Sequence, residues 1–451
     1  MNLKRRSFLS GGAVLAASTA MPVIAKKSGR SFVELPPENG GRAEEAAKKL
    51  ILGAPCLQAP SDTTMGVAWT VNVLANGWVE YAENPELKDA KVAMCGSYGV
   101  TGFDDRILQV RLTDLKPATK YWYRVHARHI DYVHNYKRYP LDAAVGEIHS
   151  FTTFGPGADA HFCVMNDTHA KWESFARITE KITSLHPSAI LWNGDAQNQT
   201  EDRETGVEIF LAPPIPRPGY AADTPVLWVN GNHDFRGFWA RKMESFVMTR
   251  LPSERDSRDW ALTRNFAVRL GDIAMIGLDT GEDKPDAHPQ FVGLVRCEPY
   301  RVAQTAWLED QFKRPEIANA RFVVAFCHIP LFDPDPAAHP GGLIDNGGGR
   351  YRTAFSAWEK SCADMWGPVL ARNGCQLVIA AHQHCYRFDP ATPERPWAQI
   401  IGGGPKLTQP GMPSYPTVIE GYVADGLLNI TVHNIRDNTV QATHTFTPRS
   451  V

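Results

Sequence analysis

The feature that most constrains the fold is a series of short, almost unbroken apolar runs between residues 160 and 384. Runs of this kind are typical of strands that are covered on both faces. Amphipathic stretches lie between some of them, and in residues 172–185 the apolar side chains fall on one helical face before Pro187 ends the pattern. The sequence therefore predicts an α/β core. The runs are HFCVMND, AILWNGD, PVLWVNGNHD, IAMIGLDT, RFVVAFCH and CQLVIAAHQH.

The preceding part of the chain has a different pattern. Residues 52–153 alternate apolar and polar side chains in short stretches separated by turn residues, which indicates an antiparallel β-sandwich. With 451 residues, the chain is longer than one hydrophobic core usually supports, so we expect more than one domain. The stretch VRLTDLKPATKYWYRV resembles the end of a fibronectin type III-like module, which would make Leu115 and Tyr121 core residues.

Side chains of the kinds that bind metals follow five of the six apolar runs. A single Asp, Asn or His after a strand is usually a turn or capping residue, and GNHD at 231–234 taken alone fits a polar turn equally well. In open α/β folds, however, ligands gather beyond the carboxyl ends of the strands. We therefore expect one shared site, and we expect Asp279, at the end of the remaining run IAMIGLDT, to support its loops. The residues of the site are Asp167, His169, Asp195, Asn232, His233, Asp234, His328, His382 and His384.

The donor atoms of this set restrict the metal. They are imidazole nitrogens, carboxylate oxygens and one amide oxygen, a mixture that suits Zn, Fe or Mn better than a thiolate site or an all-oxygen calcium site. The set is large enough for two ions if one carboxylate bridges them. Two ions about 3.5–4 Å apart stabilise both oxygens of an in-line displacement, so the composition favours phosphoester hydrolysis.

These motifs resemble, in order and spacing, those of the calcineurin-like metallophosphoesterase family: DTH at 167–169, GD at 194–195, GNHD at 231–234, His328 and HQH at 382–384. With the sandwich in front, the architecture is similar to that of purple acid phosphatases. The resemblance implies a four-layer metallophosphoesterase β-sandwich flanked by helices, preceded by an all-β fibronectin III-like domain. It also implies a ligand set: Asp167, His169 and His384 for the first ion, Asn232, His328 and His382 for the second, and Asp195 between them.

The resemblance further implies an activity. A hydroxide bridging the two ions would attack a phosphate monoester, His233 would protonate the leaving group as general acid, and Asp234 would orient or charge-tune that imidazole. Two alternatives remain open at this stage. The same centre would serve a phosphodiesterase for nucleotides or a phospholipid headgroup, and a degenerate fold of this kind would be a non-catalytic binding protein.

Two positions depart from the purple acid phosphatase pattern. Those enzymes have a tyrosine three residues after the bridging aspartate, where this chain has Asn198, and a glycine where this chain has His169. We therefore expect a centre without a tyrosinate ligand, and the departure leaves the identity of the first metal open.

The N-terminus resembles a bacterial twin-arginine export signal, with Arg5-Arg6 followed by Ser7, Phe8 and Leu9 and a short apolar stretch. The alternative is a disordered basic tail. Export predicts a periplasmic or secreted protein that uses the twin-arginine machinery, with no stable membrane insertion. Because that machinery carries folded proteins, the eight cysteines need not form disulfides, although Cys56 and Cys95 are left as a candidate pair.

A net charge of −2 argues against a broad nucleic-acid surface. We therefore expect a small phosphoester as the partner. For the same reason we interpret residues 126–142 as an exposed hairpin rather than a base-stacking platform. Arg350 and His339, in the Pro/Gly-rich loop after His328, are candidates for substrate contacts, as are Asp333 and Asp335; the alternative is that all four are ordinary solvated loop residues. The expected boundaries are a signal peptide at 1–25, a linker at 26–50, the sandwich at 51–155, the catalytic domain at 160–410 and a closing β-hairpin at 411–451.

Overall fold

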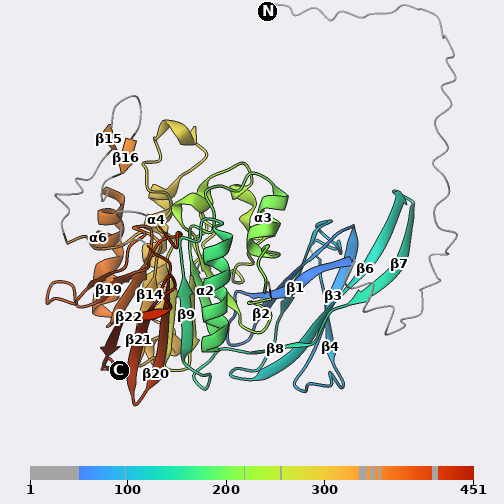
Figure 1. The fold of residues 1–451 in the computed structure, drawn as a ribbon, viewed down its shortest axis with the longest axis horizontal. Coiled ribbons are helices and arrows are strands. Elements are labelled where there is room, and N and C mark those ends of the chain that lie inside the picture. Colours follow the sequence, from blue (N-terminus) through green and yellow to red (C-terminus); the bar gives the residue numbers. More distant parts are fainter. Residues whose placement is uncertain are drawn as a thin grey trace, which may run out of the picture.

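The computed structural model of the chain describes residues 50–450, except for 97, 218, 254–255, 335–342, 346–350, 354–356 and 409–414. The twin-arginine segment and the linker expected at 26–50 lie almost entirely outside the described residues. Two β-sheets packed face to face form the larger part of the molecule, and a smaller β-sandwich formed by residues before 155 lies at one end (Figure 1).

A nine-stranded sheet has three parallel strands at its centre, and each lies entirely within one of the apolar runs. They are β9 (His161–Met165), β10 (Ala189–Asn193) and β11 (Val226–Val229). Antiparallel strands from the C-terminal end of the chain extend the sheet beyond β9. They are β20 (Thr417–Ala424), β21 (Leu427–Asn434) and β22 (Thr439–Phe446).

A six-stranded sheet faces the first, and four of its strands run parallel. These are β13 (Ile273–Gly277), β14 (Phe322–Phe326), β17 (Leu377–Ala380) and β19 (Ala398–Ile401). Antiparallel strands close its two edges, β12 (Phe266–Leu270) beside β13 and β18 (Arg387–Asp389) beside β19.

Helices cover the outer faces of both sheets, which gives four layers. The helices α2 (Trp172–Leu185) and α3 (Arg203–Phe210) share a hydrophobic core with the nine-stranded sheet. On the other side, α4 (Cys297–Gln311), α5 (Pro315–Ala318) and α6 (Ala357–Arg372) pack on the six-stranded sheet, and a third core lies between the sheets. The predicted fold class is confirmed, because strands buried on both faces carry the unbroken apolar runs.

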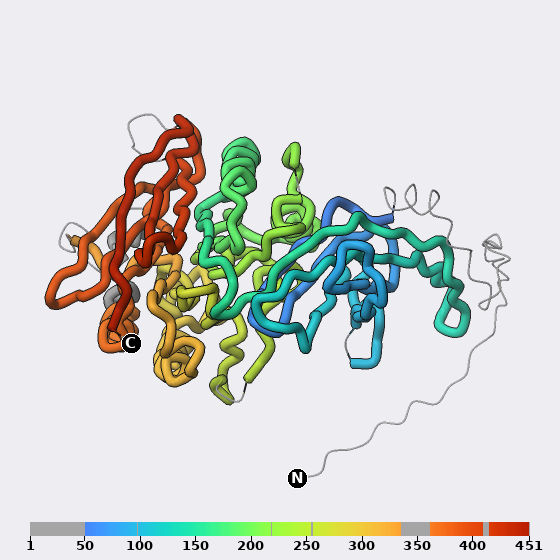
Figure 2. Tube along the Cα trace, turned by 90° about the horizontal axis from the view of Figure 1, so that it is seen from below, coloured from blue at the N-terminus to red at the C-terminus, as the bar shows by residue number. Residues whose placement is uncertain are grey.

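The N-terminal sandwich shares a sheet with the larger part. Its strands β1 (Ile51–Gln58), β2 (Met65–Val71) and β5 (Ile107–Leu112) are the last three of the nine-stranded sheet, joined through the pairing of Gln58 with Val226. The facing sheet consists of β3 (Ala75–Ala82), β4 (Lys91–Met94), β6 (Lys120–His134), β7 (Lys137–Val145) and β8 (His149–Thr152). Figure 2 shows this unit at one end of the molecule and the C-terminal strands at the other. Leu115 and Tyr121 lie in the core of the sandwich, as predicted.

Short elements complete the described chain: the 3-10 turns η1 (Asn232–Phe235), η2 (Ala240–Ser245) and η3 (Pro289–Phe291), and the strand pair β15 (Leu343–Asp345) and β16 (Tyr351–Thr353). The stretch 126–142 belongs to the β6–β7 hairpin, near whose tip Tyr136 is 90% exposed. All eight cysteines are free thiols; Cys56 lies against the carbonyls of Phe210 and Leu211, away from Cys95. No helix in the described ranges has the length and apolarity needed to cross a membrane.

Candidate metal centre

The predicted ligands lie on loops that follow the carboxyl ends of β9, β10, β11, β14 and β17. Five of them have left-handed backbone conformations with φ between 44° and 68°, which non-glycine residues rarely adopt and which cost about 1–3 kcal/mol each. Such strain persists only where the surroundings fix the backbone, and it concentrates at functional sites. The five are Asp167, His169, Asp195, His382 and His384.

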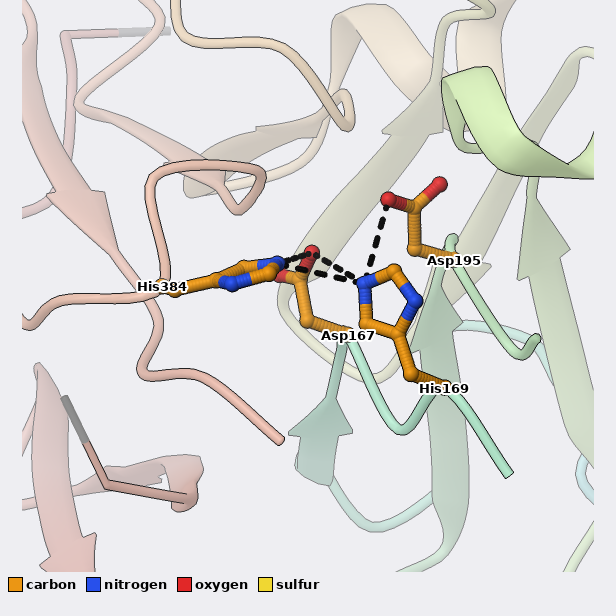
Figure 3. A group of neighbouring side chains, drawn as sticks. All are labelled: Asp167, His169, Asp195 and His384. Carbon is orange, nitrogen blue, oxygen red and sulfur yellow. Dashed lines mark hydrogen bonds and ion pairs between the residues drawn. The ribbon is translucent and has the colours of Figure 1, made fainter. Parts of the chain in front are cut away.

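Four side chains form the first group of potential ligands (Figure 3). His384 Nε2 lies 3.1 Å from Asp167 Oδ1 and 3.2 Å from His169 Nε2. His169 Nε2 in turn lies 3.5 Å from Asp195 Oδ2. The side chain of Asp167 is fully buried, whereas that of His384 is 37% exposed, so the group is reached from the side of His384.

Asp195 also belongs to a second group, with His328 and His382. His328 Nε2 lies 3.3 Å from Asp195 Oδ2, and Asn232 Oδ1 lies 3.0 Å from His382 Nδ1. The same carboxylate oxygen of Asp195 therefore faces both groups. This is the position that a bridging ligand between two ions requires.

The spacing and hydrogen bonding of these atoms fit metal ions. Metal bonds of about 2.0–2.2 Å place neighbouring ligand atoms roughly 3.0–3.5 Å apart, which matches most of the separations above. Asp167 Oδ1 and His328 Nε2 are buried, and neither has a hydrogen bond of acceptable geometry within the described part of the chain. Buried polar atoms in native proteins normally have partners, so these two atoms fit the role of ligands to a metal ion.

The charges of the cluster support the same conclusion. Burial favours a neutral His328, but the carboxylates of Asp195 and Asp167 outweigh it and raise the pKa of His328 to about 10. The pKa of His384 is also raised, because Asp167 outweighs the effect of burial. A proton on His328 therefore compensates the buried carboxylates, and bound cations would take over that role. Burial and the charge of His328 lower the pKa of His382 to about 4, which leaves its ring neutral and able to bind metal.

Two glycines allow the loops to approach this closely. Gly194 has φ 80°, and a Cβ there would lie 2.6 Å from His328 Nδ1. A Cβ on Gly231 would overlap the carboxylate of Asp195. Any larger residue at either position would displace a ligand, which explains why glycine precedes the functional residues in GD and GNHD.

His233 lies beside the ligands, and its backbone N–H donates to Asp195 Oδ1 over 2.9 Å. Its ring Nδ1 donates to the backbone carbonyl of Asn198 over 2.9 Å, so the proton that the ring gains or loses is on Nε2. Arg236 Nη1 lies 3.1 Å from that Nε2. Burial lowers the pKa of His233, Asp195 opposes this change and Arg236 adds to it.

The hydrogen bonds of Asp234 go to the backbone and not to the imidazole of His233. We expected it to orient or charge-tune the imidazole of His233; its Oδ2 accepts hydrogen bonds from the backbone N–H groups of Asp195 and Gly231 over 2.9 and 2.7 Å. The partner of the imidazole is the carbonyl of Asn198 instead. Consecutive side chains of the η1 turn point in different directions, so Asp234 fixes the two loops rather than the ring. Burial and the charge of Asp195 raise its pKa to about 8.

The two departures from the purple acid phosphatase pattern contact each other. His169 Nδ1 donates to Asn198 Oδ1 over 2.9 Å. A neutral imidazole carries one proton, and this bond holds it on Nδ1, which leaves a lone pair on Nε2 toward the first group. Asn198 therefore supports a predicted metal ligand from the position at which purple acid phosphatases have a tyrosine.

Sequence reasoning missed three supporting residues. Asn166 Nδ2 donates to Asp167 Oδ2, Asn193 Nδ2 donates to the carbonyls of Cys327 and Ile379, and Arg236 contacts the ring of His233. The signal for the two asparagines was a polar residue at the end of an otherwise apolar strand. Asp279 accepts from Asn230 Nδ2 and the Gly281 N–H.

Arg350 and His339, the candidates for substrate contacts, lie outside the described residues, as does Asp335. Asp333 is described and buried.

Comparisons with known proteins agree with this geometry. Residues 160–386 match the calcineurin-like phosphoesterase family, and residues 56–153 match the N-terminal domain of purple acid phosphatases. No curated protein matches the chain. Purple acid phosphatase PPD1 from yellow lupin seeds is similar in structure, with a TM-score of 0.56 and 13% identity over 87% of this chain and 74% of that one. GAP50, the anchor in the inner membrane complex of Plasmodium, has a TM-score of 0.44 and 12% identity over 65% of this chain and 90% of that one.

At these identities, the structural similarity to the lupin enzyme shows the fold alone. The family match and the geometry of the cluster support a metal-dependent phosphoester hydrolase, because such an enzyme needs the buried carboxylate and imidazole donors that this chain brings together. The chain belongs to the calcineurin-like phosphoesterases, with the architecture of the purple acid phosphatases.

Proposed function

We propose that this protein is an exported phosphatase that hydrolyses phosphate monoesters at a centre of two metal ions, each Fe, Zn or Mn. The observation that carries the proposal is the position of Asp195 between the two ligand groups. Asp167, His169 and His384 would hold one ion, and Asn232, His328 and His382 the other. Export rests on the twin-arginine resemblance of residues 5–9.

Bound metal ions would supply positive charge for the phosphoryl oxygens and lower the pKa of a water molecule. The chain itself supplies the proton for the leaving group. His233 Nδ1 is fixed by the Asn198 carbonyl, so the proton on Nε2 is the one that it can transfer. Because its pKa is lowered, the protonated ring is a stronger acid than a free imidazolium.

The experiment measures hydrolysis of a panel of phosphomonoesters and phosphodiesters after loading with each metal. His233→Ala should retain the ions but lose about 10²–10⁴-fold in turnover, most on substrates with poor leaving groups. Asp195→Ala should be more damaging, because it removes a contact to both ions. Full activity of His233→Ala on poor leaving groups would disprove its role as general acid.

The panel also separates the alternatives. Preferred cleavage of diesters would favour the phosphodiesterase. Purified protein that holds far less than two ions per chain, and that cleaves no ester, would favour the non-catalytic binding protein.

A further inference from the structure

A pocket of about 560 Å³ lies beside the candidate centre, between residues 235–244 and the segment that precedes and begins α4. Its volume is in the range of about 300–1,000 Å³ that small-molecule sites occupy. None of the predicted metal ligands lines it, so it is a feature separate from the ligand set.

Arg236 connects the pocket to the general acid. Its Nη1 lies 3.1 Å from His233 Nε2, and the same side chain lines the pocket. Glu282 and Asp283 fix the guanidinium through bonds of 2.7, 2.9 and 2.9 Å. One side chain, Arg236, therefore both lines the pocket and contacts the atom that would protonate the leaving group.

The interior of the pocket is aromatic. Phe235, Trp260, Phe291 and Tyr300 line it, and the rings of Trp260 and Tyr300 lie 5.9 Å apart at 53°. The polar groups at its base are already engaged, since the Tyr300 hydroxyl contacts Asp279 at 3.3 Å. Such walls favour a flat ring that stacks on aromatic faces and on the guanidinium of Arg236.

The rim is positively charged. Arg241 and Arg296 are exposed at the opening, and neither has a carboxylate partner in the described part of the chain. The guanidinium of Arg296 lies 5.9 Å above the ring of Trp260. Arg264, by contrast, is neutralised by Glu244 at 3.1 Å. The free charge is therefore at the outer edge of the pocket, and an anionic group on a bound ring would face it.

We propose that this pocket binds the leaving group of the substrate, and that this group is a planar aromatic ring with a negative charge on its outer edge. The inference rests on the proposed function, because it places the leaving group on the His233 side of the phosphorus. It narrows the substrate from phosphate esters in general to aryl or heteroaryl esters.

The kinetic test compares two substrates whose alcohols have similar acidity, 2-naphthyl phosphate and hexafluoroisopropyl phosphate. In Trp260→Ala, kcat/KM for the naphthyl ester should fall by about tenfold relative to the aliphatic ester, the size of one lost stacking contact. Leu294→Ala trims a pocket residue that is 65% exposed, and Val302→Ala is its matched control on α4, 59% exposed and outside the pocket. Leu294→Ala should lower kcat/KM for the naphthyl ester relative to the aliphatic ester, and Val302→Ala should not.

A binding test does not depend on catalysis. Calorimetric titration of the metal-loaded protein with 2-naphthalenesulfonate should show binding that weakens in Trp260→Ala and in Arg296→Ala but not in Val302→Ala. If the parent protein does not bind this probe, or if both pocket variants bind it as the parent does, the pocket proposal is wrong even where the protein is an active phosphatase. A preference that follows alkyl chain length instead of aromaticity would also overturn it. Binding without hydrolysis of any ester would refute the proposed function and leave the pocket as a ligand site.

Discussion

Replacing Asn198 by leucine tests the link between the two unusual positions of the centre. Asn198 Oδ1 accepts the proton of His169 Nδ1 over 2.9 Å, and this bond keeps the lone pair of His169 on Nε2. Leucine has a similar size but no acceptor. The imidazole would then be free to place its proton on Nε2, next to His384 at 3.2 Å, where it would oppose metal binding.

The magnitude follows from the contacts. Loss of one hydrogen bond costs about 0.5–1.5 kcal/mol. Removal of a residue that orients a metal-bound histidine lowers metal affinity by about 10–100-fold, equal to about 1.4–2.8 kcal/mol. Asn198 is exposed at the mouth of the centre, and water can replace part of its bond, so we expect the lower end of that range. The backbone carbonyl that holds His233 is retained, and turnover per loaded site should change little.

The assay is a competition for metal with a chelator of known affinity, followed by measurement of bound metal. Asn198→Leu should lose one ion at chelator concentrations that leave the parent loaded with two. Asn198→Asp keeps an acceptor at the same place and should retain the parent's affinity, and Gln199→Leu serves as the control at the neighbouring exposed position. Equal metal affinity of the parent and Asn198→Leu, or equal weakness of the Leu and Asp variants, would refute the reasoning.

Two other predictions concern stability. Removing metal should lower the unfolding temperature measured by calorimetry. An ion present at a hundred times its dissociation constant raises the free energy of unfolding by about 2.7 kcal/mol per site. An unchanged unfolding temperature would mean that the buried cluster is not a metal site. Glu420 tests pH dependence: burial opposes its ionisation, but hydrogen bonds from His161 and His433 outweigh burial and lower its pKa to about 2. Its stabilisation is therefore complete above its ordinary pKa of about 4.5 and is lost as the pH falls toward 2. In urea titrations, the difference in midpoint between the parent and Glu420→Gln should be larger at pH 6 than at pH 3, and an equal difference would contradict this account.

The parts of the fold that local sequence determines could be predicted. Helix α2 spans the residues at which the amphipathic pattern was found, and the buried strands lie in the apolar runs. The pairing of β20 with β9 was not foreseen, because its strand TVIEGYVA pairs with a segment about 250 residues earlier. The pairing of Gln58 with Val226, which joins the sandwich to the larger sheet, could not be predicted either, because neither residue indicates which strand its own strand will pair with.

As with the fold, only part of the candidate site could be predicted from the sequence. The ligands follow the ends of strands, so topology alone brings them together. The hydrogen bonds that hold the site residues in place do not follow from topology. Arg236 bonds to Glu282, 46 residues away in sequence, and His169 bonds to Asn198, 29 residues away. These contacts depend on side-chain directions within loops of unusual backbone geometry, and no periodicity in the sequence encodes them. The same limit applies to Asp234, whose hydrogen bonds go to two backbone N–H groups and not to the ring of its neighbour in sequence.

The geometry also resolves the two interpretations of GNHD. Asn232–Phe235 is a 3-10 turn, so the polar-turn interpretation is correct, and the same turn carries Asn232 and His233 to the centre. The turn is held by Asp234, whose Oδ2 accepts from the backbone N–H groups of both the GD and GNHD loops. A residue that caps a turn and a residue that binds a metal need the same property, a polar side chain at the end of a strand. A metal centre differs from a set of separate turns in that its side chains converge. Here five predicted ligands, including the two buried carboxylates, converge from residues with left-handed backbone conformations.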